Sequence, residues 1–153
     1  DKILLGIPFY GRDFPSLMDE EEPEMLIPTW SSQNRSVVTI FKLHVDKLME
    51  SDKFTNINGK EIKVKEWLVK NEWVEELGVH YIKFIDEENK VHEIWYEHER
   101  SLKLKAKLVK KYHLAGVAVW QQAYGRDSFW EVIDNELQNS SDSSLSNGTQ
   151  HEK

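Results

Sequence analysis

Two short apolar segments, far apart in the chain, constrain its fold more than any other feature. Residues 2–12 begin as an apolar run and end at a Gly-containing turn that displays Tyr10 and Arg12, while residues 114–120 form a second apolar run that ends at Trp120. Apolar strands with a polar or aromatic side chain at their carboxyl ends build the active face of a (β/α)8 barrel. The pair therefore predicts an α/β fold in which these segments are strands of such a barrel.

Length limits how much of a barrel the chain can form. It has 153 residues, whereas a complete (β/α)8 barrel needs about 250. The sequence has no initiator Met and opens directly on the first predicted strand. We therefore expect a segment of a longer protein that supplies part of the barrel.

Composition narrows the classes of partner. The formal net charge of −7 argues against a nucleic-acid partner, because proteins that bind nucleic acids present a basic surface. The chain has no cysteine, which excludes disulfides and thiolate metal sites. No apolar run approaches the roughly 18 residues of a membrane helix. We expect no nucleic-acid partner and no membrane insertion, and uncharged ligands such as neutral sugars remain open.

The remaining patterns predict helices and one hairpin. Apolar residues at helical spacing predict helices over 37–50, 60–76, 100–112 and 127–137. Alternating apolar residues predict a β-hairpin of residues 79–85 and 91–96, with a turn around 87–90. A turn centred on Glu88 and Asn89 would set Ile82 opposite Trp95 and Phe84 opposite Glu93.

The segments between these elements are predicted as irregular. Three prolines and an acidic run make residues 13–35 a loop. The composition of residues 139–153 predicts a disordered Ser-rich tail. The order strand, long insertion with a hairpin, helix, strand, helix is that of two consecutive βα units with a small α+β module inserted into the first.

Several side chains have an ordinary structural interpretation. The acidic sequence at 86–88 is predicted to be a solvated turn, and Trp67 and Trp130 are predicted to be core residues. Trp95 is a pairing residue of the hairpin that could also line a cleft wall. The three histidines near the hairpin have no metal-ligand spacing, so we interpret them as surface residues and expect no metal and no cofactor; they are His80, His92 and His98.

The sequence resembles the family 18 glycoside hydrolases, which include chitinases, endo-N-acetylglucosaminidases and catalytically silent lectins. The resemblance rests on three blocks in the family's order. Residues 2–12 look like the seventh barrel strand, residues 92–97 are followed by a helix at 101–112, and residues 114–120 look like the eighth strand. The block at 92–97 and the missing cysteines are most similar to bacterial members, including those that act on spore cortex or cell wall.

The resemblance implies a partial (β/α)8 TIM barrel, made of its last two βα units, with an inserted α+β subdomain. It divides the chain into four parts. These are residues 1–12 (seventh strand), 13–98 (loop and insertion subdomain), 99–138 (last helix, strand and helix) and 139–153 (tail).

The resemblance also implies a binding site for N-acetylglucosamine-containing sugars. Trp120 matches the tryptophan at the floor of the family's cleavage subsite, where an aromatic plane stacks on a sugar ring. Tyr10 and Arg12 match residues that hydrogen-bond the sugar or neighbouring carboxylates, and Tyr96 is a lesser candidate. After Trp120 many members have Glu-Leu-Gly, whereas this chain has Gln-Gln-Ala at 121–123, which puts subsite preference in doubt.

Family 18 enzymes use the substrate's own acetamido group as nucleophile, in a retaining reaction that needs one acidic Glu from the protein. The family's Asp-x-x-Asp-x-Asp-x-Glu motif is absent from this sequence, so we expect no catalytic residue in the chain and no activity from it alone. The implied parent is a secreted or spore-associated, monomeric glycosidase of chitin, chito-oligosaccharide or peptidoglycan.

Two other interpretations remain open. A barrel that has lost its acid would be a chitin-type lectin, and the residue at the acid's position distinguishes the two. A truncated product with no function of its own would expose two strand edges and tend to aggregate.

Overall fold

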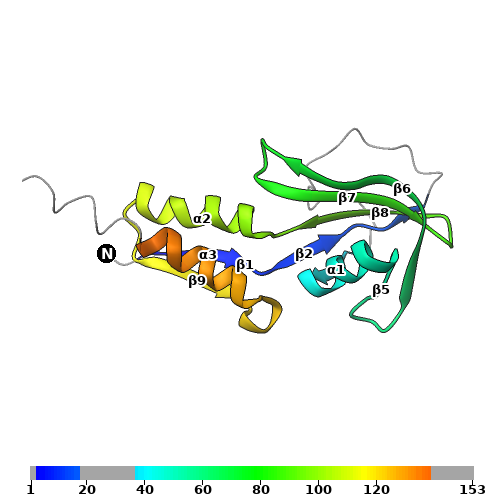
Figure 1. Cartoon of the computed structure of the whole chain (residues 1–153), viewed down its shortest axis with the longest axis horizontal. Helices are drawn as coiled ribbons and strands as arrows, with labels where there is room; N and C mark the ends of the chain where they lie inside the picture. The colour runs from blue at the N-terminus through cyan, green and yellow to red at the C-terminus, as the bar shows by residue number, and fades with distance from the viewer. Residues whose placement is uncertain (1–2, 18–36, 139–153) are drawn as a thin grey trace, which may run out of the picture.

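The computed structural model describes residues 3–17 and 37–138. Its strands are β1 (Leu4–Pro8), β2 (Tyr10–Asp13), β3 (Ser16–Leu17), β4 (Val38–Phe41), β5 (Lys53–Thr55), β6 (Glu61–Val74), β7 (Val79–Asp86), β8 (Lys90–Tyr96) and β9 (Gly116–Trp120). Its helices are α1 (Lys42–Ser51), α2 (Glu99–Lys111), α3 (Asp127–Gln138) and the short 3-10 helix η1 (Gln122–Tyr124). These elements form two regions that lie end to end along the molecule (Figure 1).

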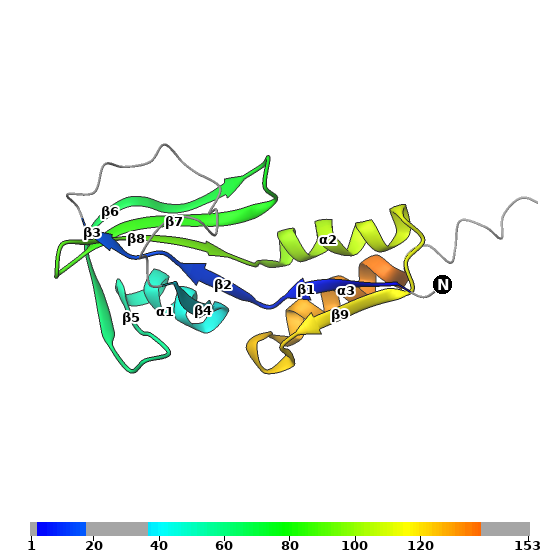
Figure 2. The same cartoon turned by 180° about the vertical axis from the view of Figure 1, so that it is seen from behind.

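The first region, here called the βα region, consists of β1, β9, α2 and α3. β1 and β9 pair in parallel, from Leu4 opposite Gly116 to Pro8 opposite Trp120. The two helices pack against this pair (Figure 2) around one apolar core, which contains Ile7, Phe9, Leu102, Ala106, Phe129 and Ile133. The predicted strands in 2–10 and 114–120 are thus confirmed, as are the helices predicted over 100–112 and 127–137.

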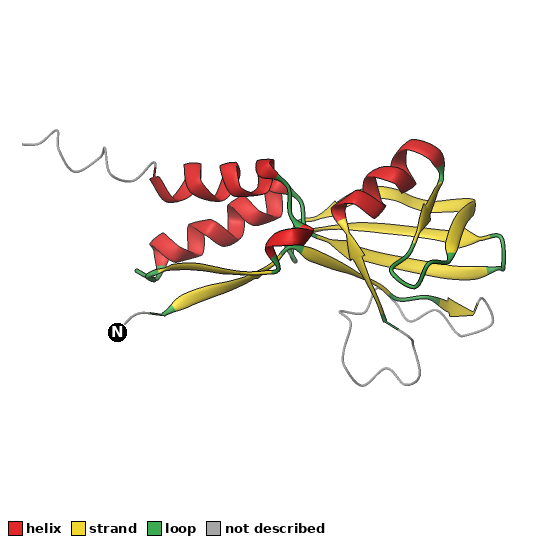
Figure 3. Ribbon diagram, turned by 90° about the horizontal axis from the view of Figure 1, so that it is seen from below, coloured by secondary structure: helices red, strands yellow, loops and turns green. Residues whose placement is uncertain are grey.

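The second region, here called the module, is an antiparallel sheet with one helix. Within the described residues, seven strands form the sheet in the order β4-β2-β8-β7-β6-β5, with β3 also pairing with β8. α1 lies on one face of the sheet (Figure 3) and buries Val45 and Leu48 against it. Ile82, Phe84 and Ile94 on the facing strands have no solvent exposure, so the module has its own core.

Gly11 does not form the turn that the sequence suggested. β1 ends at Pro8, and after Phe9 the chain continues as β2, which pairs with β4 and β8. A Cβ atom on Gly11 would lie 2.4 Å from the Trp95 carbonyl oxygen and 2.8 Å from Tyr96 Cβ. Glycine is therefore required here for the close approach of β2 to β8, and β2 carries the chain from one region into the other.

Two of the predicted helices are wholly or partly wrong. The helix predicted over 60–76 is the strand β6, which pairs with β7 along most of its length. Three register irregularities interrupt its alternation, between residues 64 and 72, so its apolar residues fall at a spacing that imitates a helix. The helix predicted over 37–50 begins only at Lys42, because Val38, Thr39 and Ile40 are β-branched and form β4.

The predicted hairpin is confirmed, but its register is shifted by one residue. Trp95 pairs with Tyr81 instead of Ile82, and Phe84 pairs with His92 instead of Glu93. The connecting loop contains three residues, the last of which, Asn89, has a φ of 59°. A three-residue loop that ends in a left-handed residue shifts the pairing relative to a two-residue turn.

Two residues expected at the surface are buried. His92 is 3% exposed and Asp86 is 2% exposed, so the predictions of a surface histidine and of a wholly solvated acidic turn are wrong for these side chains. His80 and His98 are half-buried. Trp67 packs against the module core, as predicted, but from a strand, while Trp130 is 38% exposed instead of a core residue.

Most of the predicted loop at 13–35 and the whole predicted tail at 139–153 lie outside the described residues. In the part of the chain that the structure describes, no helix is long and apolar enough to cross a membrane.

Candidate functional site

Trp120 ends β9 with its side chain directed away from the apolar core. Its exposed fraction is 70%, the largest among the exposed large hydrophobic side chains of the described residues. The strand end is fixed by its pairing with Pro8 and by the Phe9 amide, which donates to the Trp120 carbonyl at 2.9 Å. A rigid backbone thus presents a flat aromatic surface with one N–H donor at its edge.

Tyr10 and Arg12 lie on the same face of β2 as each other, because alternate residues of a strand share a face. The Arg12 guanidinium carbon lies 4.7 Å from the centre of the Tyr10 ring. Arg12 Nη1 donates to Thr39 Oγ1 on the adjacent strand β4 at 2.7 Å. Both side chains are half-buried, and the planar guanidinium has five N–H groups in total. The pair is therefore held in place while further donors remain.

The structure brings Trp95 to the same face. Trp95 pairs directly with Arg12 across β8 and β2, and its ring centre lies 4.4 Å from that of Tyr81 on β7. The sequence suggested a cleft-wall role for Trp95 only as an alternative to hairpin pairing. Its proximity to Arg12 depends on a pairing between residues more than 80 positions apart, which the local pattern around Trp95 does not contain.

Tyr96 lies on the opposite face of β8. Its exposed fraction is 4%, and its hydroxyl donates to Asn71 Oδ1 at 3.0 Å. Burial, with a smaller contribution from the charge of Glu99, raises the pKa of Tyr96 to about 12. The structure therefore does not bring Tyr96 together with Tyr10 and Arg12, and it places this side chain in the module core.

The ends of β9 and β2 meet where the two regions touch. The ring of Tyr124, four residues beyond Trp120, stacks on Phe41 at a centre-to-centre distance of 4.1 Å. Phe41 is in turn the pairing partner of Tyr10. The stack of Tyr124 on Phe41 therefore joins the segment that follows Trp120 to the strand that pairs with Tyr10. We take this junction between the two regions as the candidate site.

Polar contacts reinforce the junction. Arg126, which directly precedes α3, forms an ion pair with Asp46 of α1 in the module. Within the βα region, Ser128 Oγ donates to Glu99 Oε1 at 2.8 Å and joins α3 to α2. The relative position of Trp120 and β2 is thus held by both stacking and charge.

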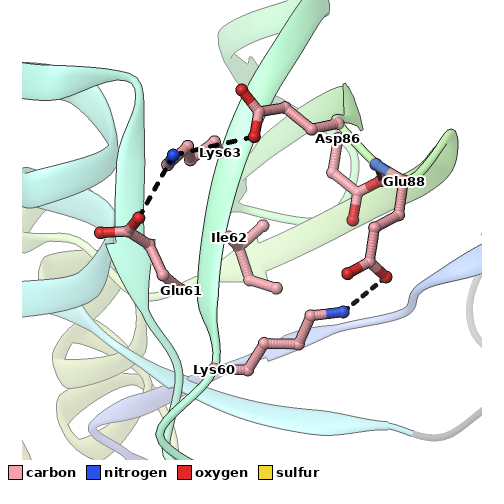
Figure 4. A pocket seen from close by; sticks show the side chains of 7 residues that line it. Lys60, Glu61, Ile62, Lys63, Asp86 and Glu88 are labelled. Atoms are coloured by element: carbon pink, nitrogen blue, oxygen red, sulfur yellow. Dashed lines mark hydrogen bonds and ion pairs between the residues drawn. The ribbon is translucent and has the colours of Figure 1, made fainter.

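A separate hollow of about 160 Å³ lies near the ends of β6 and β7 (Figure 4). Its lining is polar apart from Ile62, and its charges pair with one another: Lys60 with Glu88 at 2.6 Å and Lys63 with Glu87 at 3.8 Å. It contains no aromatic side chain. The hollow therefore has neither an aromatic surface nor an unpaired lysine, and the junction remains the candidate site.

No group of three or more His, Cys, Asp or Glu side chains in the described residues is placed to hold a metal ion. The carboxylates near the junction make internal contacts: Glu97 accepts from Ser101 Oγ at 2.6 Å and pairs with Lys105, and Glu99 accepts from Ser128. The junction as described is thus suited to binding and orienting a ligand.

Comparison with known proteins gives consistent results. The model of glycosyl hydrolases family 18 matches residues 1–125. The uncharacterized glycosylase YvbX of Bacillus subtilis is 25% identical over 133 residues, which cover 87% of this chain and 30% of that protein. The chain thus spans about a third or less of the curated relatives it matches.

Two solved structures share the fold at low identity. A chitinase from Chromobacterium violaceum superposes with a TM-score of 0.62 and 19% identity, over 89% of this chain and 33% of that chain. The spore cortex-lytic enzyme SleL of Bacillus megaterium gives a TM-score of 0.59 and 18% identity, over 89% of this chain and 25% of that chain. The family match spans well over half of the sequence, and the chain belongs to glycosyl hydrolases family 18.

Proposed function

We propose that this chain is the C-terminal part of a glycosidase that cleaves β-1,4 bonds in polymers containing N-acetylglucosamine. In this proposal β1 is the seventh strand of a (β/α)8 barrel, β9 is the eighth, and the module (within residues 13–98) is inserted between them. The parallel pairing of β1 with β9 and the packing of α2 and α3 on that pair support this assignment. So does the exposed apolar surface at Leu4, which six further strands of a barrel would cover.

One observation carries the assignment of the site: Trp120 is 70% exposed at the carboxyl end of a parallel strand. That is the end at which (β/α)8 barrels bind their substrates. We assign Trp120 as the stacking surface under a sugar ring. Tyr10 and Arg12 are polar contacts, and Trp95, which pairs with Arg12, extends the same wall.

The chain's own residues would bind and orient the sugar. Arg12 and the Tyr10 hydroxyl can donate hydrogen bonds to sugar oxygens, while Trp120 fixes the plane of the ring. The proposal takes the reaction to be the substrate-assisted, retaining hydrolysis of this family, in which the acetamido oxygen attacks the anomeric carbon. The acidic Glu that protonates the leaving oxygen lies outside this chain, and no cofactor is needed.

A carbohydrate-binding protein without catalysis is the second candidate. It would use the same proposed binding residues, in a longer protein that lacks the family's acidic Glu. The two candidates share the site and differ in the residue at the acid's position in the longer protein. An extracellular or cell-surface location, secreted or spore-associated, suits either one, because the similar structures include a spore cortex-lytic enzyme.

Titration of the chain with a chitin tetrasaccharide tests the site. Trp120→Ala should raise the Kd by about tenfold or more, as truncation of a central aromatic anchor does. Trp73→Ala is the matched control, because it removes an indole whose ring is covered by the Arg100 guanidinium at 3.9 Å. Equal affinity of both variants and the unmodified chain would refute the assignment of Trp120.

Product analysis in the same experiment tests the catalytic part. The isolated chain should leave the tetrasaccharide intact over many hours, because it lacks the acid. Shorter sugars released by the pure chain, and not by its Trp120→Ala variant, would contradict an acid outside the chain.

A further inference from the structure

A buried histidine joins three strands of the module. His92 on β8 lies with Nδ1 2.8 Å from Asp13 Oδ2 on β2 and with Nε2 3.2 Å from Asp86 Oδ2 on β7. All three side chains are almost completely buried. The imidazole also stacks on Phe84, with ring centres 4.7 Å apart and planes within 5°. The ring is thus fixed in plane and in direction, with one carboxylate at each nitrogen.

These two contacts require two protons. An ionised carboxylate can only accept hydrogen bonds, and a neutral imidazole can donate only one. Both contacts are hydrogen bonds if His92 is an imidazolium, or if one aspartate is protonated beside a neutral ring. Loss of a proton from either arrangement leaves a nitrogen lone pair facing a carboxylate oxygen in a buried site, which is costly. The cluster of His92, Asp13 and Asp86 therefore holds a defined number of protons in the intact module.

Asp86 has hydrogen-bond partners at both of its carboxylate oxygens. Its Oδ1 accepts from the backbone amides of Glu88 at 2.9 Å and of Lys90 at 2.8 Å. Asp13 Oδ1, in contrast, is buried without a hydrogen-bond partner among the described residues, so His92 is the group that compensates the burial of Asp13.

The charges around His92 are dominated by these two aspartates. Burial alone would lower the pKa of His92, but the hydrogen bond and charge of Asp13, and then those of Asp86, raise it above its ordinary value. Burial raises the pKa of Asp13 as well, and Glu93, on the same strand as His92, adds further negative charge near Asp13. Both shifts favour a cluster that keeps its second proton, with Phe84 covering the face of the ring.

We propose that His92 is a positioning residue: as an imidazolium between Asp13 and Asp86, it fastens β2 to the β7–β8 hairpin and thereby holds Arg12 opposite Trp95. Asp13 directly follows Arg12, and Asp13 and Arg12 pair with Ile94 and Trp95. Within the described residues these are the pairs between β2 and β8, so the contact near this short ladder limits how far β2 can move. The consequence for sugar binding rests on the proposed function, whereas the fastening of the strands does not.

The contribution of His92 to folding stability changes with pH in a definite direction. Because the pKa of His92 is raised in the folded chain, its stabilising contribution is complete below the ordinary histidine pKa of about 6.5. This contribution to stability is lost as pH rises through the raised pKa that His92 has in the folded chain. Burial lowers the pKa of His80 to about 4 and lowers the pKa values of His44 and His98 as well. Those three histidines therefore lose their protons at lower pH than His92 does.

The test compares urea unfolding midpoints of the chain between about pH 6 and about pH 9. The unmodified chain should lose stability as pH rises, and His92→Gln should remove that dependence, since glutamine does not titrate. His113→Asn is the control: His113 is exposed, with a φ of 53° that asparagine tolerates. Its profile should match that of the unmodified chain. A pH dependence that persists in His92→Gln would overturn the proposal.

Nitrogen NMR of the His92 ring tests the protonation state directly and does not need the His92→Gln variant. Both ring nitrogens should carry protons at neutral pH, and Asp13→Asn should shift the ring's titration to lower pH while keeping an acceptor oxygen. A neutral ring at neutral pH, together with no shift in Asp13→Asn, would overturn the proposal even if His92→Gln failed to fold.

Sugar affinity separates this proposal from the proposed function. If both hold, the Kd for the chitin tetrasaccharide should rise with pH in parallel with the loss of the His92 proton. Absence of sugar binding at every pH, with an imidazolium at His92, would refute the proposed function and leave the fastening intact. Sugar affinity that stays constant while His92 loses its proton would refute the positioning role.

Discussion

The module and the βα region are built from the same kinds of element but bury them to different extents. In the module, Ile82, Phe84 and Ile94 are enclosed between the sheet and α1. In the βα region the helices cover one face of β1 and β9, while Ile3, Leu4 and Trp120 are 54–70% exposed. The module is thus closed on its own core, whereas the βα region leaves large apolar side chains of its strands open to solvent. The candidate site lies where the closed part meets the open part.

The largest expected effect is in the module core. Phe84 has no solvent exposure and packs against His92 and Trp67. Phe84→Ala should lower the free energy of unfolding by about 3–5 kcal/mol, as cavity-forming substitutions of buried phenylalanines do. Urea unfolding followed by circular dichroism measures this.

Leu43→Ala on α1 is the control for Phe84, because Leu43 is a large apolar residue of the same module with an exposed side chain. Its effect should stay within about 0.5 kcal/mol. If the two variants were equally stable, the module would not have the closed core described above.

The next largest effect on stability is expected from substitution of a strand glycine, and each region offers one. A Cβ on Gly11 would meet three atoms of neighbouring strands within 3 Å, whereas one on Gly6 would meet nothing within 4 Å. Gly11→Ala should therefore destabilise the chain by about 1–3 kcal/mol through overpacking. Gly6→Ala should be neutral or stabilising by up to about 1 kcal/mol. Thermal unfolding of both variants compares the regions directly, and equal midpoints would contradict the difference in their packing.

How far the sequence predicts this structure also differs between the regions. The βα region follows from local patterns: an unbroken apolar run predicts β9, and a stripe of Leu102, Ala106 and Val109 opposite lysines predicts α2. These elements are regular, so the period of two or 3.6 is intact. Their parallel pairing was expected from the resemblance to a family and is present in the structure.

The module does not follow from local patterns, because irregular strands build it. β6 loses its alternation at three register irregularities, and the hairpin register depends on one left-handed residue, Asn89. A signal for His92 was nevertheless available. His92 alternates with Ile94 and Tyr96 on one strand, which places it on the buried face. Its partner Asp13 is 79 residues away, and the sequence gives no indication of that contact.

The same alternation bears on Tyr96, which the sequence predicted as a sugar contact. Tyr96→Phe removes the hydrogen bond to Asn71 and should cost about 1 kcal/mol of stability. Sugar affinity should be unchanged if Tyr96 acts only in the core. Calorimetric titration of the variant with a chitin tetrasaccharide decides this, and a loss of affinity larger than the loss of stability explains would restore Tyr96 as a contact residue.

The smallest expected effect concerns the ion pair between the regions. Arg126 and Asp46 are both partly exposed, and pairs of this kind contribute about 0.2–1 kcal/mol. Arg126→Gln should therefore lower the unfolding midpoint slightly at low salt and by less at high salt, because salt screens exposed charges. Lys53→Gln is the control, since Lys53 pairs with Glu61 inside the module at 3.4 Å.

The informative measurement for Arg126→Gln is the cooperativity of unfolding. If Arg126 and the stack of Tyr124 on Phe41 couple the regions, the variant should separate the transition of the βα region from that of the module, and Lys53→Gln should not. Near- and far-ultraviolet circular dichroism that still coincide in Arg126→Gln would mean that β2, which continues the chain from β1 into the module, couples the regions without the ion pair. The covalent path through Phe9 and Tyr10 would then hold the site together.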